Sequence, residues 1–383
     1  MTVTAAQGFE ASGIAIGLKD SGGKDLALIV NRGPRHSSAA VFTSNRAQAN
    51  PILWSKQVID DGTVSAIILN SGGANCFTGP QGFQTTHATA EAVAAALDLS
   101  AGDVLVCSTG LIGEQLDRDK LLPGVATAAA QLSVDGGDDA AEAILTTDSH
   151  PKTAILKGDG WVIGGMAKGA GMLAPGLATM LVVLTTDADL ASDQLDRSLR
   201  AATRVSFDRL DSDGCMSTND QVSLLASGAS GVQPDSETFT AAVREICLDL
   251  ARQLQGDAEG SRHDITIEVH GAVTEDDAVE VGRSVARNNL FKAAVFGNDP
   301  NWGRVLAAIG TTKAPFDPYA VDVTMNGVRV CHAGAPDAPR EDVDLTERAV
   351  SVVIDLKEGT ESATILTNDL THDYVHENSA YSS

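Results

Sequence analysis

Aromatic residues, basic residues and long apolar runs are all scarce in this chain of 383 residues. Aromatics make up 4%, so a core must depend on Val, Ile, Leu and Ala. Acidic residues outnumber basic ones by 51 to 27, and a net charge of −24 without a basic cluster disfavours nucleic-acid binding. No apolar run approaches the about 18 residues of a membrane helix, and the opening MTVTAAQGFE lacks the features of a signal peptide. We therefore expect a cytoplasmic protein that binds neither nucleic acid nor membrane.

The cysteines and histidines show no spacing that is typical of a disulfide framework or a metal site. The five cysteines are odd in number and contain no CxxC pair. The eight histidines contain no HExxH pattern. His372 and His376 have a helical spacing, but the surrounding tail favours strand and loop. The sequence therefore predicts no metal and no disulfide scaffold.

Short apolar runs that end in turn residues alternate with helical patterns along the chain. Strands are expected at residues 25–31, 65–70, 103–107 and 265–269, and helices at 86–97, 123–132, from 192, and from 274 to about 290. No linker or repeat divides the chain. This order predicts an α/β fold of the α+β type, with mixed sheets covered by helices in two lobes of one compact assembly.

Several local signals predict where elements begin or turn. Pro123 suits the first turn of a helix, where its missing N–H costs nothing. Thr274 and Asp277 form a capping-box-like start. Glycines at residues 158–160 predict a hairpin, and Asn326-Gly327 predicts another. A further late hairpin is expected from the runs at 351–356 and 363–366.

Residues 164–188, GGMAKGAGMLAPGLATMLVVLTTDA, place a small-residue tract directly before an apolar run. The simpler interpretation is a tight turn into a strand. The alternative is chemistry at the Ala178–Thr179 bond: attack of the Thr179 hydroxyl on the preceding carbonyl, followed by hydrolysis of the ester, leaves an N-terminal threonine. The new α-amine, with a pKa of about 7.7–8.0, can then act as the base for its own hydroxyl.

Two other features suit acyl transfer. The sequence Ser108-Thr109-Gly110 follows a predicted strand, and Thr109 with a nearby backbone N–H can donate to an oxyanion; an ordinary strand-to-loop turn has the same sequence. Lys168 can bind a carboxylate, although most loop lysines are simply solvated. The glycine-rich tract is no phosphate loop, because Pro175 and a β-branched run follow where a helix would begin.

These segments resemble the ornithine acetyltransferase family, the bifunctional glutamate N-acetyltransferases of arginine biosynthesis, over essentially the whole chain. The similar blocks are residues 165–188, CSTGLIGE at 107–114, AILTTD at 143–148, FGNDPNWGRVLAAIG at 296–310 and the closing ENSAYSS. The resemblance implies transfer of the acetyl group from N2-acetyl-L-ornithine to L-glutamate without a cofactor. It leaves open whether acetyl-CoA is also a co-substrate.

The resemblance also implies a role for individual residues. Cleavage between Ala178 and Thr179 would give an α chain of residues 1–178, with the N-terminal lobe, and a β chain of residues 179–383. Thr179 would be the nucleophile, and Thr109 and Gly110 the oxyanion hole. The implied substrate contacts are Thr146, Lys168, Thr179, Glu259, Asn378 and Ser383. Two α and two β chains would form a heterotetramer.

Two other classes of function remain compatible with the residues. One is a self-processing N-terminal-nucleophile amidohydrolase or aminopeptidase that uses water as its acceptor. The other is an uncleaved binding protein without catalytic activity. Glutamate dependence separates the first from a transferase, and an intact chain in active material supports the second.

Overall fold

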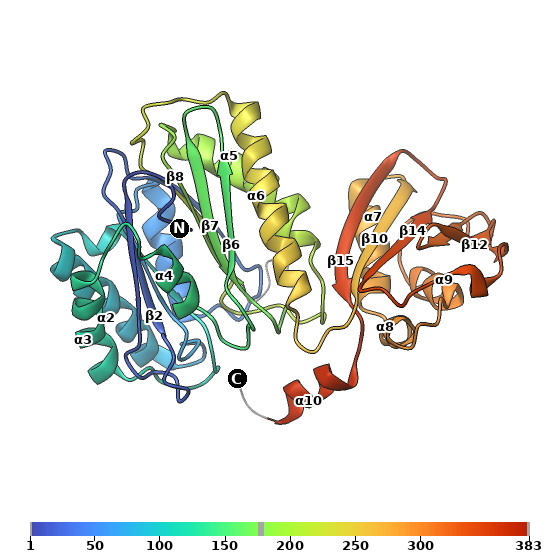
Figure 1. Cartoon of the computed structure of the whole chain (residues 1–383), viewed down its shortest axis with the longest axis horizontal. Coiled ribbons are helices and arrows are strands. Elements are labelled where there is room, and N and C mark those ends of the chain that lie inside the picture. The colour runs from blue at the N-terminus through green and yellow to red at the C-terminus, as the bar shows by residue number, and fades with distance from the viewer. Residues whose placement is uncertain (1, 175–179, 381–383) are drawn as a thin grey trace.

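The computed structural model describes residues 2–174 and 180–380, so Ala178, Thr179 and Ser383 lie outside the described residues. Figure 1 shows a larger body, which contains the chain up to α6 (Ser236–Gly256), and a second lobe that begins with β10 (Asp264–Ala272). Both contain sheets with parallel and antiparallel pairs, and helices pack against them. The predicted α/β architecture in two lobes is confirmed.

The body contains two sheets and the helices that cover them. The first sheet has the order β1 (Phe9–Ile14), β2 (Leu26–Asn31), β4 (Ala66–Asn70), β5 (Val104–Ser108). The second has the order β3 (Ser37–Phe42), β9 (Gln221–Ala226), β8 (Leu181–Thr186), β7 (Val162–Lys168), β6 (Lys152–Lys157). The other helices of the body are α1 (Asn50–Val58), α2 (Gly79–Leu97), α3 (Arg118–Ala130), α4 (Gly137–Ala143) and α5 (Ser192–Val205).

The two sheets stack face to face because their strands are apolar on both sides. In β8, Leu181 and Val183 pack with residues of the first sheet, whereas Val182 and Leu184 pack toward α5 and α6. This alternation follows the two-residue period of a strand. The outer face of the first sheet packs against α2 and α3. The body is therefore a four-layer helix–sheet–sheet–helix sandwich, and its inner strands are buried on both faces.

The second lobe has its own apolar core. Its sheet has the order β13 (Ala335–Pro336), β12 (Val328–His332), β11 (Asp322–Met325), β14 (Ala349–Asp355), β10, β15 (Glu361–Asn368). Its helices are α7 (Glu275–Ala286), α8 (Asn289–Phe296) and α9 (Trp302–Ile309). Short 3₁₀ helices span Ile59–Asp61, Ala101–Asp103, Phe207–Arg209 and Arg340–Asp342. From this lobe, α10 (His372–Ala380) runs back toward the body (Figure 1).

The four strands predicted at 25–31, 65–70, 103–107 and 265–269 are confirmed as β2, β4, β5 and β10. Both glycine-containing hairpins are also confirmed, namely β6 with β7 and β11 with β12. The predicted hairpin of β14 with β15 is wrong, because β10 lies between them, parallel to β14 and antiparallel to β15. The apolar pattern marks a strand without marking its neighbour, so sequence proximity misled the pairing.

Three helix predictions and the prediction for the C-terminal tail need correction. The helix expected at 86–97 begins at Gly79. The helix expected at 123–132 begins at Arg118, where the Asp117 carboxylate accepts the Asp119 N–H at 3.0 Å, so that Pro123 lies inside it. The helix from Thr274 ends at Ala286, and Asn288 caps the separate α8 by accepting the Phe291 N–H at 2.9 Å. The tail around His372 is helical rather than strand and loop.

Along the chain, residues 178 and 179 come between β7 and β8 of the second sheet. These two strands are antiparallel, with Lys168 paired opposite Leu181. The lobe boundary lies later, between α6 and β10. In the described part of the chain, no helix combines the length and apolar character that a membrane crossing requires.

Candidate active site

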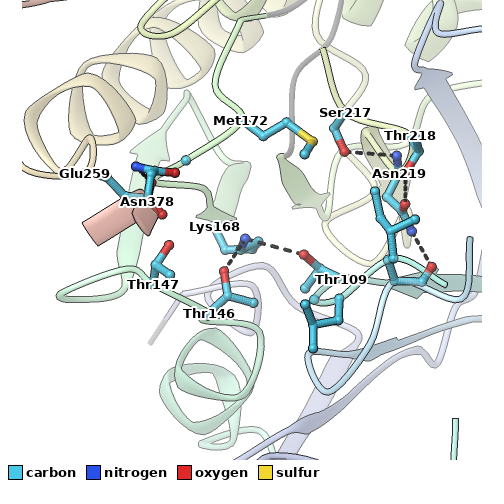
Figure 2. Close-up of a pocket in the computed structure, with 15 residues that line it drawn as sticks. Thr109, Thr146, Thr147, Lys168, Met172, Ser217, Thr218, Asn219, Glu259 and Asn378 are labelled. Atoms are coloured by element: carbon cyan, nitrogen blue, oxygen red, sulfur yellow. Dashed lines mark hydrogen bonds between the residues drawn. The ribbon is translucent and has the colours of Figure 1, made fainter. Parts of the chain in front are cut away.

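Loops and element ends of the larger body, together with α10 from the second lobe, line a cavity of about 310 Å³. Its lining includes six residues that the sequence singled out: Thr109, Gly110, Thr146, Lys168, Glu259 and Asn378. Figure 2 shows that they come from segments far apart along the chain. The other predicted site residues, Ala178, Thr179 and Ser383, lie outside the described residues.

Lys168 is the last residue of β7, and its ammonium group is buried beside the cavity. Its Nζ donates to Thr146 Oγ1 at 2.7 Å and to Thr109 Oγ1 at 3.5 Å (Figure 2). Burial lowers the pKa of Lys168, and the carboxylate of Asp148 opposes this shift. A cation held in place by hydroxyl groups and one carboxylate can attract a ligand carboxylate without a change of conformation.

Asp148, which precedes β6 in the chain, has a fully buried side chain that supports this lysine. Its Oδ2 lies 3.8 Å from Lys168 Nζ and its Oδ1 2.6 Å from Lys152 Nζ, while Lys152 also pairs with Asp257. Oδ1 accepts the Gly169 N–H at 2.6 Å as well. Burial opposes ionisation of Asp148, but the two ammonium groups outweigh it and hold the pKa below its ordinary value. The sequence reasoning assigned no role to Asp148, although it ends the AILTTD block.

Thr109 and Gly110 form a turn at the end of β5. The Thr109 N–H donates to the Asn70 carbonyl at 2.9 Å, and the Thr109 carbonyl accepts the Gly73 N–H at 2.9 Å. Gly110 has a φ of 124°, and an added Cβ would lie 2.7 Å from the Gly73 nitrogen. Only glycine fits this turn. The Thr109 hydroxyl accepts from Lys168 and keeps its own proton for donation toward the cavity.

Glu259 follows α6 and is largely buried, in contrast to the surface position that its sequence context alone favours. The Glu259 N–H donates to the Ala170 carbonyl at 3.0 Å, which fixes the backbone just after Lys168. Asn378 on α10 donates from Nδ2 to Glu259 Oε2 at 2.9 Å. The helix from the second lobe thus completes one wall of the cavity (Figure 2).

The segment before β9 also lines the cavity, and the sequence reasoning missed it. Ser217, Thr218 and Asn219 are buried there. Asn219 Nδ2 donates to the carbonyl oxygens of Ala74 at 2.7 Å and Ser108 at 2.8 Å. A polar run directly before an apolar strand was the available signal, but nothing local indicated its distant partners.

The cavity therefore combines an ammonium group, a carboxylate and a turn that can donate hydrogen bonds. Lys168 suits a ligand carboxylate, and Glu259 suits a ligand ammonium group. The Thr109–Gly110 turn suits an oxygen that gains negative charge during a reaction. These groups fit a small zwitterionic amide that undergoes acyl transfer.

Comparisons with known proteins show the family of the chain. The model of the ArgJ family matches residues 10–383. The arginine biosynthesis bifunctional protein ArgJ of Streptomyces avermitilis is 67% identical over 383 residues, which cover 100% of both chains. The protein of that name from Mycobacterium bovis is 53% identical over 389 residues, with 100% of this chain and 96% of the relative covered. A solved structure of an ornithine acetyltransferase from Mycobacterium tuberculosis, complexed with ornithine, has 56% sequence identity and a TM-score of 0.45, and the match covers 45% of this chain and 94% of that chain. The chain thus belongs to the ArgJ family, which confirms the resemblance to the ornithine acetyltransferases, and it is an acyltransferase.

Proposed function

We propose that this enzyme transfers the acetyl group of N2-acetyl-L-ornithine to L-glutamate through an acetyl ester on Thr179. The observation that carries this proposal is the convergence of Thr109, Lys168, Glu259 and Asn378 on one cavity from separate elements. Further support comes from the strand pairing, since Lys168 lies opposite Leu181, two residues after Thr179 in the chain.

The nucleophile is generated by self-cleavage. The Thr179 hydroxyl attacks the carbonyl carbon of Ala178, the acyl group moves from nitrogen to oxygen, and the nitrogen takes up a proton. Water then hydrolyses the ester to give a carboxylate at residue 178 and an α-amine on Thr179. Since such an amine has a pKa of about 7.7–8.0, a large fraction of it is neutral and basic near pH 8.

Acetyl transfer then proceeds in two half-reactions. The α-amine takes the proton of the Thr179 hydroxyl as its oxygen attacks the acetyl carbonyl, and ornithine leaves with a proton on its own α-amine. The α-amine of glutamate attacks the resulting ester, and the threonine oxygen regains its proton. Thr109 and Gly110 stabilise both oxyanions, and one such donor is worth about 3 kcal/mol.

Substrate recognition follows from the charges around the cavity. Lys168 binds an α-carboxylate, supported by Thr146, and Glu259 with Asn378 binds the cationic side chain of ornithine. Ser383 adds a contact from the C-terminus. An amide is consumed and an amide is formed, so the reaction needs neither a nucleotide nor a metal cofactor. Acetyl-CoA remains a candidate second donor, tested by glutamate acetylation without acetylornithine.

The test begins with the state of the chain. We expect the purified protein to show a second N-terminus, Thr-Met-Leu-Val, and Thr179→Ala to give one uncleaved chain without activity. Native mass measurement tests a heterotetramer of two α and two β chains, and cell fractionation tests the cytoplasmic location.

Acetylornithine turnover with and without glutamate separates transfer from hydrolysis. Ornithine release must depend on glutamate in a transferase. Release at the full rate without glutamate identifies an amidohydrolase instead, and full activity of the uncleaved Thr179→Ala chain contradicts the nucleophile.

A further inference from the structure

Asp220 is a buried carboxyl group directly before β9, and no step of the proposed reaction uses it. Its side chain is fully buried, and its Oδ1 accepts the Met180 N–H at 2.9 Å. That N–H is part of the peptide bond between Thr179 and Met180. The Gln221 N–H donates to the Met180 carbonyl at 3.1 Å, so both polar groups of the Met180 backbone bind this segment. We call residues 217–221, which lead into β9, the corner.

Asn219, the residue before Asp220, contacts the segment that carries the predicted oxyanion hole. Asn219 donates from Nδ2 to the carbonyls of Ser108 and Ala74. Ser108 directly precedes Thr109, and Ala74 lies in the loop after β4, where its N–H donates to the Leu111 carbonyl at 2.9 Å. The backbone N–H of Asn219 donates to Ser217 Oγ at 3.1 Å (Figure 2). The residue after β3 holds this segment in turn, because Thr43 Oγ1 donates to the Ser217 carbonyl at 2.7 Å.

Two consecutive residues thus contact the two segments whose separation matters for acyl transfer. We propose that Asn219 and Asp220 are positioning residues of the acetyl transfer, which fix the strand after the nucleophile and the oxyanion turn to one rigid corner. This inference rests on the proposed function, since it assumes that Thr179 is the nucleophile. A displacement of about 1 Å in such a centre costs about 100-fold in rate.

The chemistry of Asp220 suits an uncharged acceptor. Burial raises the pKa of Asp220 well above its ordinary value. The hydroxyl groups of Thr43 and Ser217 also hydrogen-bond the carboxyl group and partly oppose this shift. An amide has the same shape and keeps a carbonyl oxygen for the Met180 N–H. Asparagine is therefore the conservative replacement at this position, and alanine removes the acceptor.

The experiment compares Asp220→Asn, Asp220→Ala and Asn219→Ala in the full chain, with Asp187→Ala as the matched control. Asp187 is equally buried at the other end of β8 and accepts the backbone N–H groups of Val162 at 2.8 Å and Gln7 at 3.1 Å. The readouts are the rate of chain cleavage, kcat and KM for acetylornithine, and the melting temperature.

We expect Asp220→Ala and Asn219→Ala to lower kcat about 100-fold, with KM changed less than about threefold. Asp220→Asn recovers cleavage and kcat to within about tenfold of the parent, with the same pH profile, because it keeps the acceptor. Asp187→Ala lowers the melting temperature and leaves cleavage and kcat unchanged. If Asp220→Ala does not fold, Asn219→Ala and Asp220→Asn still decide the matter.

The proposal is overturned if Asp220→Ala or Asn219→Ala turns over at the parent rate. It is also overturned if Asp187→Ala loses as much kcat, since the effect then follows stability alone. Failure of Asp220→Asn to rescue shows that an ionisable group is needed, which excludes the positioning role. An active, uncleaved Thr179→Ala chain contradicts the proposed function itself, whatever the result at Asp220.

Discussion

Replacing Asp148 by asparagine tests the buried charge network that holds Lys168. The substitution keeps the side-chain shape but removes the negative charge between Lys168 and Lys152, whose side chains are 2% and 0% exposed. Breaking a buried pair from one side typically costs 3–5 kcal/mol, because a charge is left uncompensated. Since Lys152 keeps Asp257, we expect the lower end, about 3 kcal/mol.

Asp139→Asn is the matched control on the surface. Asp139 lies 2.6 Å from Lys24 Nζ, the same distance as Asp148 from Lys152, and Lys24 also keeps a second carboxylate, Glu142. Its side chain is 57% exposed, so solvent screens the pair and the loss should be below about 1 kcal/mol. The two variants therefore differ in burial at nearly constant geometry.

The assay is urea unfolding of both variants in the Thr179→Ala background, so that a single continuous chain is compared.

The sign of the pH dependence of this stability difference also follows from the structure. Because the folded pKa of Asp148 is depressed, its contribution is present above the unfolded pKa of about 3.9 and is lost as the pH falls toward the folded pKa. The difference in the free energy of unfolding between the parent and Asp148→Asn must therefore become smaller at acidic pH. Equal costs for Asp148→Asn and Asp139→Asn would refute the reasoning.

Three further predictions concern the reaction centre. Thr109→Ala should lower kcat about 100- to 1,000-fold by removing an oxyanion donor, in a steady-state assay with little change in KM. Gly110→Ala should lower both the rate of chain cleavage and the melting temperature, since the added Cβ would lie 2.7 Å from the Gly73 nitrogen. An unchanged cleavage rate and melting temperature would contradict this geometry of the turn. Because the folded pKa of Asp220 is raised, its unfolded form ionises first as the pH rises above about 3.9, so the stability of Asp220→Asn relative to the parent should increase with pH in urea titrations.

The elements of the fold were predictable where the signal is local. The apolar runs of β2 and β4 and the Asn326-Gly327 turn fix conformation over a few residues, and the structure confirms them. The pairing of β14 with β10 was not predictable in this way. An alternating strand shows which face is buried, but it carries no mark of the strand that will lie beside it.

The same limit applies to the site. Thr109 and Lys168 were recognised from their residue type and glycine-rich surroundings, and the structure brings both to one cavity. The partner that holds Lys168, Asp148, lies twenty residues earlier in the chain, and Asn219 reaches a carbonyl more than a hundred residues away. Such contacts depend on how loops converge after the sheets stack, which no periodicity encodes. Glu259 and Asn378 were identified only through the family resemblance.

The pairing of Glu259 with Asn378 leads to a prediction about substrate choice. In the proposed function, the Glu259 carboxylate binds the cationic side chain of ornithine, and a charge-assisted hydrogen bond contributes about 1.5–3 kcal/mol. Glu259→Gln should therefore raise KM for acetylornithine about 10- to 150-fold, while Asn378 can still donate to the new amide oxygen. Glutamate has a carboxylate in place of that ammonium group, so its KM should stay constant or fall. Separate measurement of the two KM values decides the matter, because an equal increase for both substrates would mean that Glu259 shapes the cavity wall without reading the charge of the donor.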